Sequence, residues 1–337
     1  MPIRPQRTLK TILTAVALTG LLVVLVPIWA LHRVVSGLLV RRPKGSRTAI
    51  ERIAATDVDL NELLASHRPV VITGLTEQLG LPLVPDLDGL RELARSNSTT
   101  FTVKSHSARA PYFLYVGDYG AELVGSEQMT LATFLDSMFD RAAIAGDTCT
   151  YRLFGVNDLD GDIGRIIDTM ADGLGVLTDR RPDRLASGIW IGSSGVVTPL
   201  HHDAWTGLLF QMTGSKRVLM FPPTERPNLY FTSPFAAKDR WSMLPGRSDD
   251  ADPADFPRFA RTHGFEAQLD AGDVLFIPAF WSHEIEALEA NISIPFRFGT
   301  RTMDQLNPGF LRPAYEVFDR KYVEPVRSHA VSARSRS

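Results

Sequence analysis

The hydrophobic and polar positions of this chain follow three successive patterns. The first is a 20-residue apolar run without a charged side chain, residues 12–31. The second is a mixed region in which apolar residues recur with helical spacing, next to one short apolar run typical of a strand. We predict helices over 60–69, 87–96 and 131–143, and a strand with its turn over 70–75.

From about Tyr151 the pattern changes to short apolar runs separated by turn residues. Many short strands without alternating helices favour a barrel or sandwich over a doubly wound sheet. The turn TGSK, residues 213–216, has the composition of a hairpin connection. The polar, Pro- and Asp-rich stretch 233–264 is interpreted as an insertion and a candidate lid. The predicted strands are GIWIG near residue 190, 208–212, 217–221, 274–278 and 291–298.

The apolar run Ile12–Leu31 predicts a transmembrane helix, because twenty helical residues span about 30 Å of hydrocarbon. Trp29 lies near one end, where interfacial aromatic residues are common, and Pro27 does not exclude a span. A cleaved signal peptide is the alternative, although no clear A-x-A site follows. Basic residues flank both ends and lean slightly toward a cytoplasmic C-terminal domain. We therefore expect a single-pass membrane protein whose catalytic domain is cytoplasmic.

Composition and charge narrow the classes of function only a little. Hydrophobic residues make up 44% of the 337 residues and charged residues 22%, as in an ordinary globular protein. The net charge of −2 gives no indication of nucleic-acid binding. With Cys149 as the single cysteine, no internal disulfide can form, which fits a reducing compartment.

The candidate chemistry lies in two words of the second half, TPLHHDAWTG and IPAFWSHEIEAL. His201 and Asp203 alternate, so in a strand they share a face while His202 points the other way. His283 follows 80 residues after Asp203 and reaches them only if the fold returns the chain there. Two imidazoles and one carboxylate are the ligands that hold Fe(II) with open coordination positions.

These words, with Lys216 in GSKRVLMFPP and the strand NISIPFRF, resemble the JmjC/cupin-like (cupin_8) family of Fe(II)- and 2-oxoglutarate-dependent oxygenases. The nearest branch is similar to the asparaginyl hydroxylase that inhibits hypoxia-inducible factor. The upstream words HRPVVITGL and GIWIG belong to the same resemblance, which covers roughly residues 55–300. It implies a mainly β fold with flanking helices, a double-stranded β-helix (jelly roll).

The resemblance also implies roles for individual residues. His201, Asp203 and His283 would be the iron ligands, with Fe(II), O2 and 2-oxoglutarate as cofactor and co-substrates. Thr198 and Lys216 would bind the distal carboxylate of 2-oxoglutarate, and Tyr151 would add a hydroxyl. The chain departs from the family pattern at four positions: His202 replaces an aromatic residue, Ser282 a tryptophan, and Gly207 and Pro295 polar pocket residues.

The expected domain organisation follows from these patterns. Residues 1–47 would be a membrane anchor with a basic linker, and 48–302 the oxygenase domain. Residues 303–325 would form a C-terminal helical extension, through which we expect a homodimer, and 326–337 a disordered tail. The substrate would be a protein side chain or a small molecule, and demethylation stays open beside hydroxylation. Two rivals remain: a cupin-like binding or signalling module at the membrane without oxygenase activity, and a metal cupin of another reaction type.

Overall fold

The fold is taken from a computed structural model, in which the chain divides into two units, residues 1–44 and 45–337. All statements below concern the second unit. The residues that the structure describes are 45–79, 87–110, 112, 123–139, 148–155, 161–183, 187–231 and 240–299. The predicted anchor, the C-terminal extension with its dimer contact, and the tail lie outside these residues.

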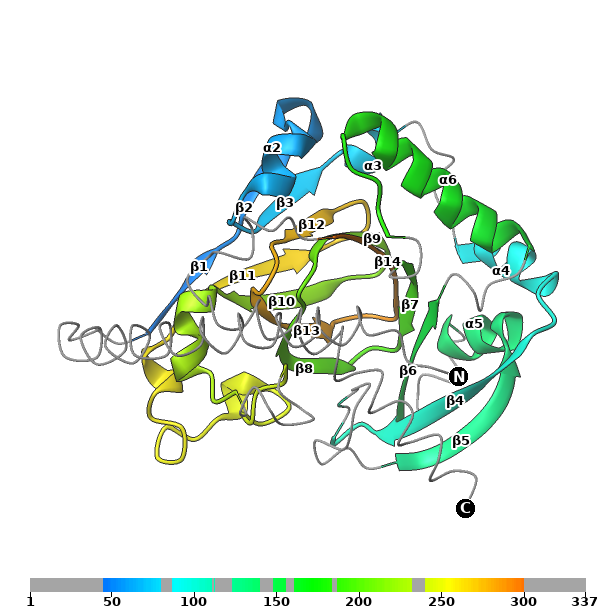
Figure 1. Cartoon of the computed structure of the whole chain (residues 1–337). Helices are drawn as coiled ribbons and strands as arrows, with labels where there is room; N and C mark the ends of the chain where they lie inside the picture. The colour runs from blue at the N-terminus through cyan, green and yellow to red at the C-terminus, as the bar shows by residue number, and fades with distance from the viewer. Residues whose placement is uncertain are drawn as a thin grey trace, which may run out of the picture. The chain divides into compact units, whose positions relative to one another are not determined.

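Two β-sheets form the centre of this unit (Figure 1). Neighbouring strands are antiparallel except β1 with β11 and β2 with β3, which are parallel. The five-stranded sheet has the order β1 (Ser46–Ala49), β11 (His263–Leu269), β10 (Lys216–Phe221), β13 (Ser282–Ala287) and β8 (Val197–His202). The nine-stranded sheet has the order β2 (Glu51–Ala54), β3 (Val70–Thr73), β12 (Val274–Ile277), β9 (Thr206–Thr213), β14 (Asn291–Phe298), β7 (Gly188–Gly192), β6 (Thr148–Gly155), β4 (Thr100–Ser107) and β5 (Leu123–Thr130).

The chain passes repeatedly from one sheet to the other between β8 and β14. Strands β8, β10, β11 and β13 belong to the five-stranded sheet, while β9, β12 and β14 belong to the nine-stranded sheet. Side chains of both sheets meet in one cluster, which includes Leu209 of β9, Val218 of β10 and Ile285 of β13. This is a jelly-roll arrangement, so the predicted mainly β, cupin-like fold is confirmed.

The central strands of the nine-stranded sheet, β3, β12, β9, β14 and β7, are buried on both faces. Leu209 and Leu275 face the other sheet, whereas their chain neighbours Leu208, Phe210 and Phe276 pack in the cluster that holds the helices. Strands buried on both sides read as continuous apolar runs, which is why LLFQM and VLFIP are so uniformly hydrophobic. The flanking helices are α2 (Leu60–Ala65), α3 (Leu75–Gln78), α4 (Leu87–Arg95), α5 (Leu131–Phe139) and α6 (Gly161–Leu177).

Most of the predicted elements are present, but two parts of the pattern were misread. The strands expected near 190 and over 208–212, 217–221, 274–278 and 291–298 are β7, β9, β10, β12 and β14. The turn between β9 and β10 contains Gly214 at φ 68°, where an added Cβ would lie 2.2 Å from the carbonyl oxygen of Ala290. Helix α6 was missed, although its buried Ile167, Met170, Ala171 and Leu174 repeat with helical spacing. Strands β1, β2, β4, β5, β6, β11 and β13 were also not among the predicted strands.

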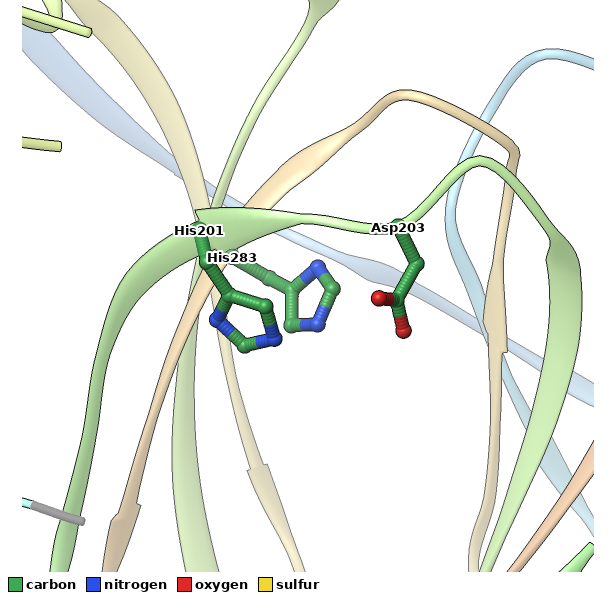
Figure 2. A group of neighbouring side chains, drawn as sticks. All are labelled: His201, Asp203 and His283. Atoms are coloured by element: carbon green, nitrogen blue, oxygen red, sulfur yellow. The ribbon is translucent and has the colours of Figure 1, made fainter. Parts of the chain in front are cut away.

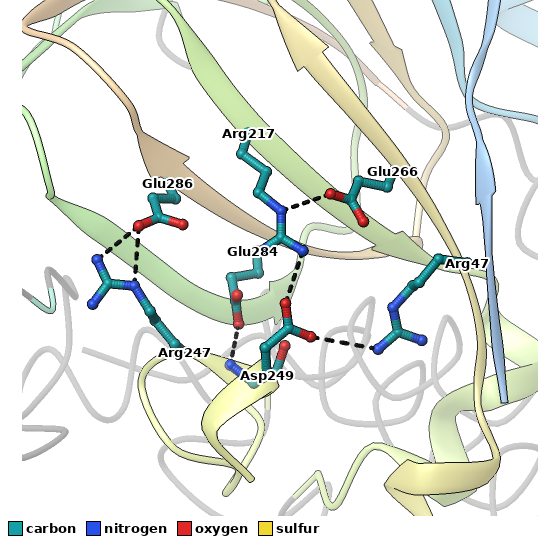
Figure 3. A network of polar contacts seen from close by, with 8 residues as sticks. Arg47, Arg217, Arg247, Asp249, Glu266, Glu284 and Glu286 are labelled. Atoms are coloured by element: carbon teal, nitrogen blue, oxygen red, sulfur yellow. Dashed lines mark hydrogen bonds and ion pairs between the residues drawn. The ribbon is translucent and has the colours of Figure 1, made fainter.

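The insertion after β10 packs on the outer face of the five-stranded sheet. Within its described part, residues 240–262, Leu244 and Phe259 are buried against Leu219 and Phe221 of β10. Ion pairs add to this contact: Arg217 of β10 bonds Asp249 of the insertion at 2.8 Å, and Arg247 bonds Glu286 of β13 at 2.7 Å (Figure 3). The insertion is therefore fixed to β13, the strand that carries His283, and to the neighbouring strand β10.

The expectation of a membrane-spanning protein with a cytoplasmic catalytic domain is wrong. Among the described residues, no helix is long and apolar enough to cross a membrane. The longest of those described is α6, which has 17 residues and carries charged side chains such as Arg165 and Asp168. The apolar run 12–31 lies outside the described residues.

Candidate metal centre

The triad is assembled by two neighbouring strands of the five-stranded sheet. His201 lies near the end of β8 and Asp203 directly after it, while His283 lies on β13 exactly opposite His201 in the antiparallel register. Directly opposed residues bring their side chains into contact, which explains how His201 and His283, 82 positions apart in the sequence, meet. The candidate ligand atoms of the three residues all lie within 4.8 Å of one another, and the side chains converge (Figure 2).

Both imidazoles are oriented by the backbone. Nδ1 of His201 lies 2.9 Å from the carbonyl oxygen of Pro199, and Nδ1 of His283 lies 3.1 Å from that of Trp281. A carbonyl oxygen can only accept, so each Nδ1 carries the proton and donates it. The lone pair of each ring is then on Nε2, the arrangement by which outer partners orient metal-binding histidines.

The protonation states also suit a cation. Burial lowers the pKa of His201 to about 3 and lowers the pKa of His283, so both rings are neutral at pH 7. Burial alone would raise the pKa of Asp203, but Arg297 and other cationic neighbours outweigh it and lower this pKa. Since the imidazoles are uncharged at neutral pH, it is the arginines Arg297 and Arg240 that stabilise the ionised carboxylate of Asp203. The site therefore offers two neutral nitrogen donors and one carboxylate.

His202, between the two ligands in sequence, faces elsewhere. Its ring is buried against Phe231, at a centroid distance of 5.1 Å, and its Nδ1 lies 3.3 Å from a guanidinium nitrogen of Arg226. The described cluster of candidate ligands does not include it. His202 is a packing residue of the outer face of β8.

A β-bulge brings Thr198 to the side of the triad. Thr198 precedes His201 by three residues, so simple alternation would put the two side chains on opposite faces. Their partners on β13, Ile285 and His283, are only two residues apart, so β8 carries one extra residue here. Bulges re-aim side chains in this way beside functional sites. Thr198 consequently shares the inner face with the triad, where it is buried.

Lys216 lies on the same inner face, on the strand next to β13. It pairs with Ala287, which alternates with Ile285 and His283, and its side chain is only 3% exposed. Nζ lies 6.0 Å from the ring centroid of Trp190. Burial lowers the pKa of Lys216 to about 7, and no carboxylate of the described residues forms an ion pair with it. A buried ammonium of this kind is stabilised by an anionic ligand.

A pocket opens beside the triad, with an empty volume of about 380 Å³ including its mouth. Its walls are mostly apolar, and Asp203, His283 and Arg297 supply the polar groups, the composition typical of a small-molecule site. The two family departures Gly207 and Pro295 line it, as do Trp190 and Trp205, whereas Trp281 packs between the sheets against Phe265. The remaining lining residues are Leu208, Leu209, Ile277, Ile285 and Phe296.

Two residues near the triad were missed by the sequence reasoning. Arg297 of β14 donates from Nη2 to Oδ2 of Asp203 at 3.2 Å, and its Cζ lies 5.6 Å from the ring centroid of Trp190. The signal for Arg297 was present, because it is the one charged residue in the apolar strand NISIPFRF. Trp241 of the insertion stacks on His201, and no sequence signal placed it there. For Tyr151 the structure describes only the backbone, in β6 opposite Gly192.

A jelly roll with two histidines and one carboxylate beside a pocket defines a candidate metal-binding cupin. The chain belongs to the cupin-like domain family, which matches residues 55–302. The family resemblance expected from the two sequence words is thus confirmed.

Curated relatives include JmjC proteins and enzymes of several kinds. The chain is 36% identical over 120 residues to "JmjC domain-containing protein C" of Dictyostelium discoideum, covering 33% of this chain and 28% of the relative. It is 36% identical over 104 residues to "tRNA wybutosine-synthesizing protein 5" of Homo sapiens, covering 31% of each. It is 32% identical over 120 residues to "Lysine-specific demethylase 8" of Xenopus tropicalis, covering 36% and 26%. The matches span less than a third of each of these relatives.

Proposed function

We propose that this protein is an Fe(II)- and 2-oxoglutarate-dependent oxygenase that hydroxylates a C–H bond of a protein side chain or a small molecule. Succinate and CO2 would be the co-products. The observation that carries the proposal is the convergence of His201, Asp203 and His283 within 4.8 Å on an inner face that also holds buried Lys216.

The donor set fits Fe(II). Two imidazole nitrogens and one carboxylate oxygen leave coordination positions open, unlike the closed sets of structural metal sites. When bound, the metal would supply oxygen activation coupled to oxidation of 2-oxoglutarate. The contribution of the chain is to keep both Nε2 atoms deprotonated and aimed, through the backbone acceptors at Pro199 and Trp281.

The co-substrate fits Lys216 and Thr198. A dicarboxylate that chelates the metal at one end needs a cation and a donor for its other carboxylate. Lys216 is a buried cation for which the described residues provide no counter-ion. Thr198 offers a hydroxyl on the same inner face of the sheet. Pairing with a carboxylate would raise the lowered pKa of Lys216 toward its ordinary value. The role of Tyr151 stays an expectation.

Buried Lys216 favours the 2-oxoglutarate-dependent oxygenase over the two rival functions. A binding module without oxygenase activity has no use for a buried lysine on the inner face of a metal site. A metal cupin of another reaction type does not need Lys216 either. Apolar walls at Gly207, Pro295 and Phe296 would exclude water from the reacting groups. Demethylation begins with the same C–H hydroxylation, so both outcomes remain within the proposal.

The test is turnover of 2-oxoglutarate without a prime substrate. The full chain, loaded anaerobically with Fe(II) and then exposed to O2, should convert 2-oxoglutarate to succinate slowly. Asp203→Ala should abolish this conversion, while Asp255→Ala, an exposed aspartate of the insertion, should leave it unchanged. Succinate formation by Asp203→Ala at the wild-type rate would contradict the proposed function.

A further inference from the structure

The insertion reaches the metal centre through a short extended segment beside β8. The backbone N–H of His202 donates to the carbonyl of Arg240 at 3.1 Å, and that of Ser242 donates to the carbonyl of Leu200 at 2.9 Å. These bonds flank an antiparallel bridge between His201 and Trp241. In this type of pair the two residues exchange no hydrogen bonds, so their side chains come closest.

The side chains of this pair are stacked. The ring centroids of His201 and Trp241 lie 4.4 Å apart with an interplanar angle of 21°. The ring of His283 lies 4.3 Å from His201 at 57°. Trp241 is 8% exposed and His201 6%, so the imidazole of His201 contacts both rings in a buried environment.

Trp241 is held by contacts that do not involve the triad. The hydroxyl of Ser242 donates to the carbonyl of Leu229 at 2.6 Å and accepts from the backbone N–H of Leu244 at 3.0 Å. The backbone N–H of Met243 donates to the carbonyl of Tyr230 at 3.0 Å. Leu244 is buried in the cluster on the outer face of the sheet. The indole is therefore a fixed surface against which His201 rests, rather than a side chain that follows it.

We propose that Trp241 is a positioning residue that fixes the ring plane of His201, so that the insertion sets the metal affinity of the site. This inference rests on the proposed metal site. The bond from Nδ1 to Pro199 fixes the direction of one ring atom, but the terminal torsion of a histidine is soft. A flat indole on one face removes the remaining tilt and keeps Nε2 aimed where Asp203 and His283 converge. An aliphatic side chain such as leucine fills part of the space without providing a flat surface.

The experiment measures Co(II) binding to the full chain under anaerobic conditions, by calorimetry and by the visible absorption of the bound ion. Trp241→Phe keeps a ring on His201 and should stay close to the wild type in affinity and spectrum. Trp241→Leu should weaken Co(II) binding by about 10-fold, the effect typical of partners that orient a metal-binding histidine, and should alter the spectrum.

A matched control separates positioning from general loss of stability. Leu244→Ala removes a buried side chain from the same segment that does not contact the triad. It should lower the melting temperature of the metal-free chain while leaving the Co(II) affinity and spectrum unchanged. If Trp241→Leu does not fold, Trp241→Met takes its place with the same expected outcome, because methionine adapts to irregular space.

The outcomes distinguish this inference from the proposed function. If folded Trp241→Leu binds Co(II) as the wild type does, the positioning role is overturned while the metal site stands. Equal losses in Trp241→Leu and Leu244→Ala would also overturn it, since a structural effect would then suffice. If the wild type takes up no Co(II), both the proposed function and this inference are overturned.

Discussion

The two sheets of the jelly roll contribute differently to the candidate metal site and the pocket beside it. The inner face of the five-stranded sheet carries buried polar groups: Thr198 and His201 on β8, Lys216 on β10 and His283 on β13. Of these four residues, His283 lines the pocket. The nine-stranded sheet contributes apolar wall, with Arg297 as the charged exception among its pocket residues. The central strands of the nine-stranded sheet are buried between the helices and the opposite sheet. The candidate chemistry thus lies on the inner face of the five-stranded sheet, while the other sheet supplies most of the strand residues of the largest core cluster.

The largest effect is expected from a substitution among the candidate metal ligands of the five-stranded sheet. His283→Ala removes one of three donors and should abolish Fe(II) uptake at concentrations that saturate the wild type. The matched control is His202→Leu, because His202 is equally buried but packs against Phe231 on the outer face. It should retain Fe(II) binding, as measured by anaerobic calorimetry. Loss of binding in His202→Leu with the fold intact would show that the two faces of β8 are wrongly assigned.

A change in the nine-stranded sheet should affect stability instead. Phe210 is fully buried and packs edge-to-face on Phe296 at a centroid distance of 5.5 Å. Phe210→Ala should lower the free energy of unfolding by about 3–5 kcal/mol, because it leaves a cavity in the core. Its Fe(II) affinity, measured below the unfolding transition, should equal that of the wild type. A loss of metal affinity in the folded variant would contradict the separation of core and chemistry.

Removing the proposed contact with the co-substrate should have a smaller effect, confined to 2-oxoglutarate binding. Lys216→Ala should weaken 2-oxoglutarate binding by roughly 2–5 kcal/mol, because a buried carboxylate loses its cation. Iron binding should change little. Arg217→Ala is the control, since Arg217 points outward to Glu266 and Asp249. Unchanged 2-oxoglutarate affinity in Lys216→Ala would support a cupin that does not use this co-substrate.

The pH dependence of 2-oxoglutarate binding should report the same lysine. Burial lowers the pKa of Lys216 to about 7, below its ordinary value of 10.5. In the free protein the ammonium therefore loses its proton as the pH rises through 7, and the cation must be restored for pairing. We expect the apparent affinity to fall by about tenfold per pH unit above 7, with proton uptake on binding, measured by calorimetry in buffers of different ionisation enthalpy. A flat profile between pH 7 and 9 would show that Lys216 is not the partner.

The sequence predicted strands β7, β9, β10, β12 and β14 and the meeting of the three triad side chains, because both leave local signals. LLFQM and VLFIP are apolar runs, and His201 and Asp203 are two residues apart in the sequence. The position of Thr198 on the inner face could not be predicted by alternation, because it depends on a bulge that only the pairing with β13 reveals. Trp241 reaches His201 through tertiary contacts of an irregular segment, which have no periodicity to read. Helix α6 was missed because Gly164, Gly173 and Gly175 weaken a helical pattern that packing nonetheless stabilises.

The proposed function requires that one face of the five-stranded sheet bind Fe(II) and 2-oxoglutarate together. This requirement is tested by anaerobic titration of the full chain with Fe(II) and then with 2-oxoglutarate, in the wild type and in Asp203→Ala. We expect about one Fe(II) per wild-type chain and 2-oxoglutarate binding that depends on the metal, with both lost in Asp203→Ala. A wild-type chain that takes up neither ligand, or an Asp203→Ala chain that binds both as tightly as the wild type, would contradict it.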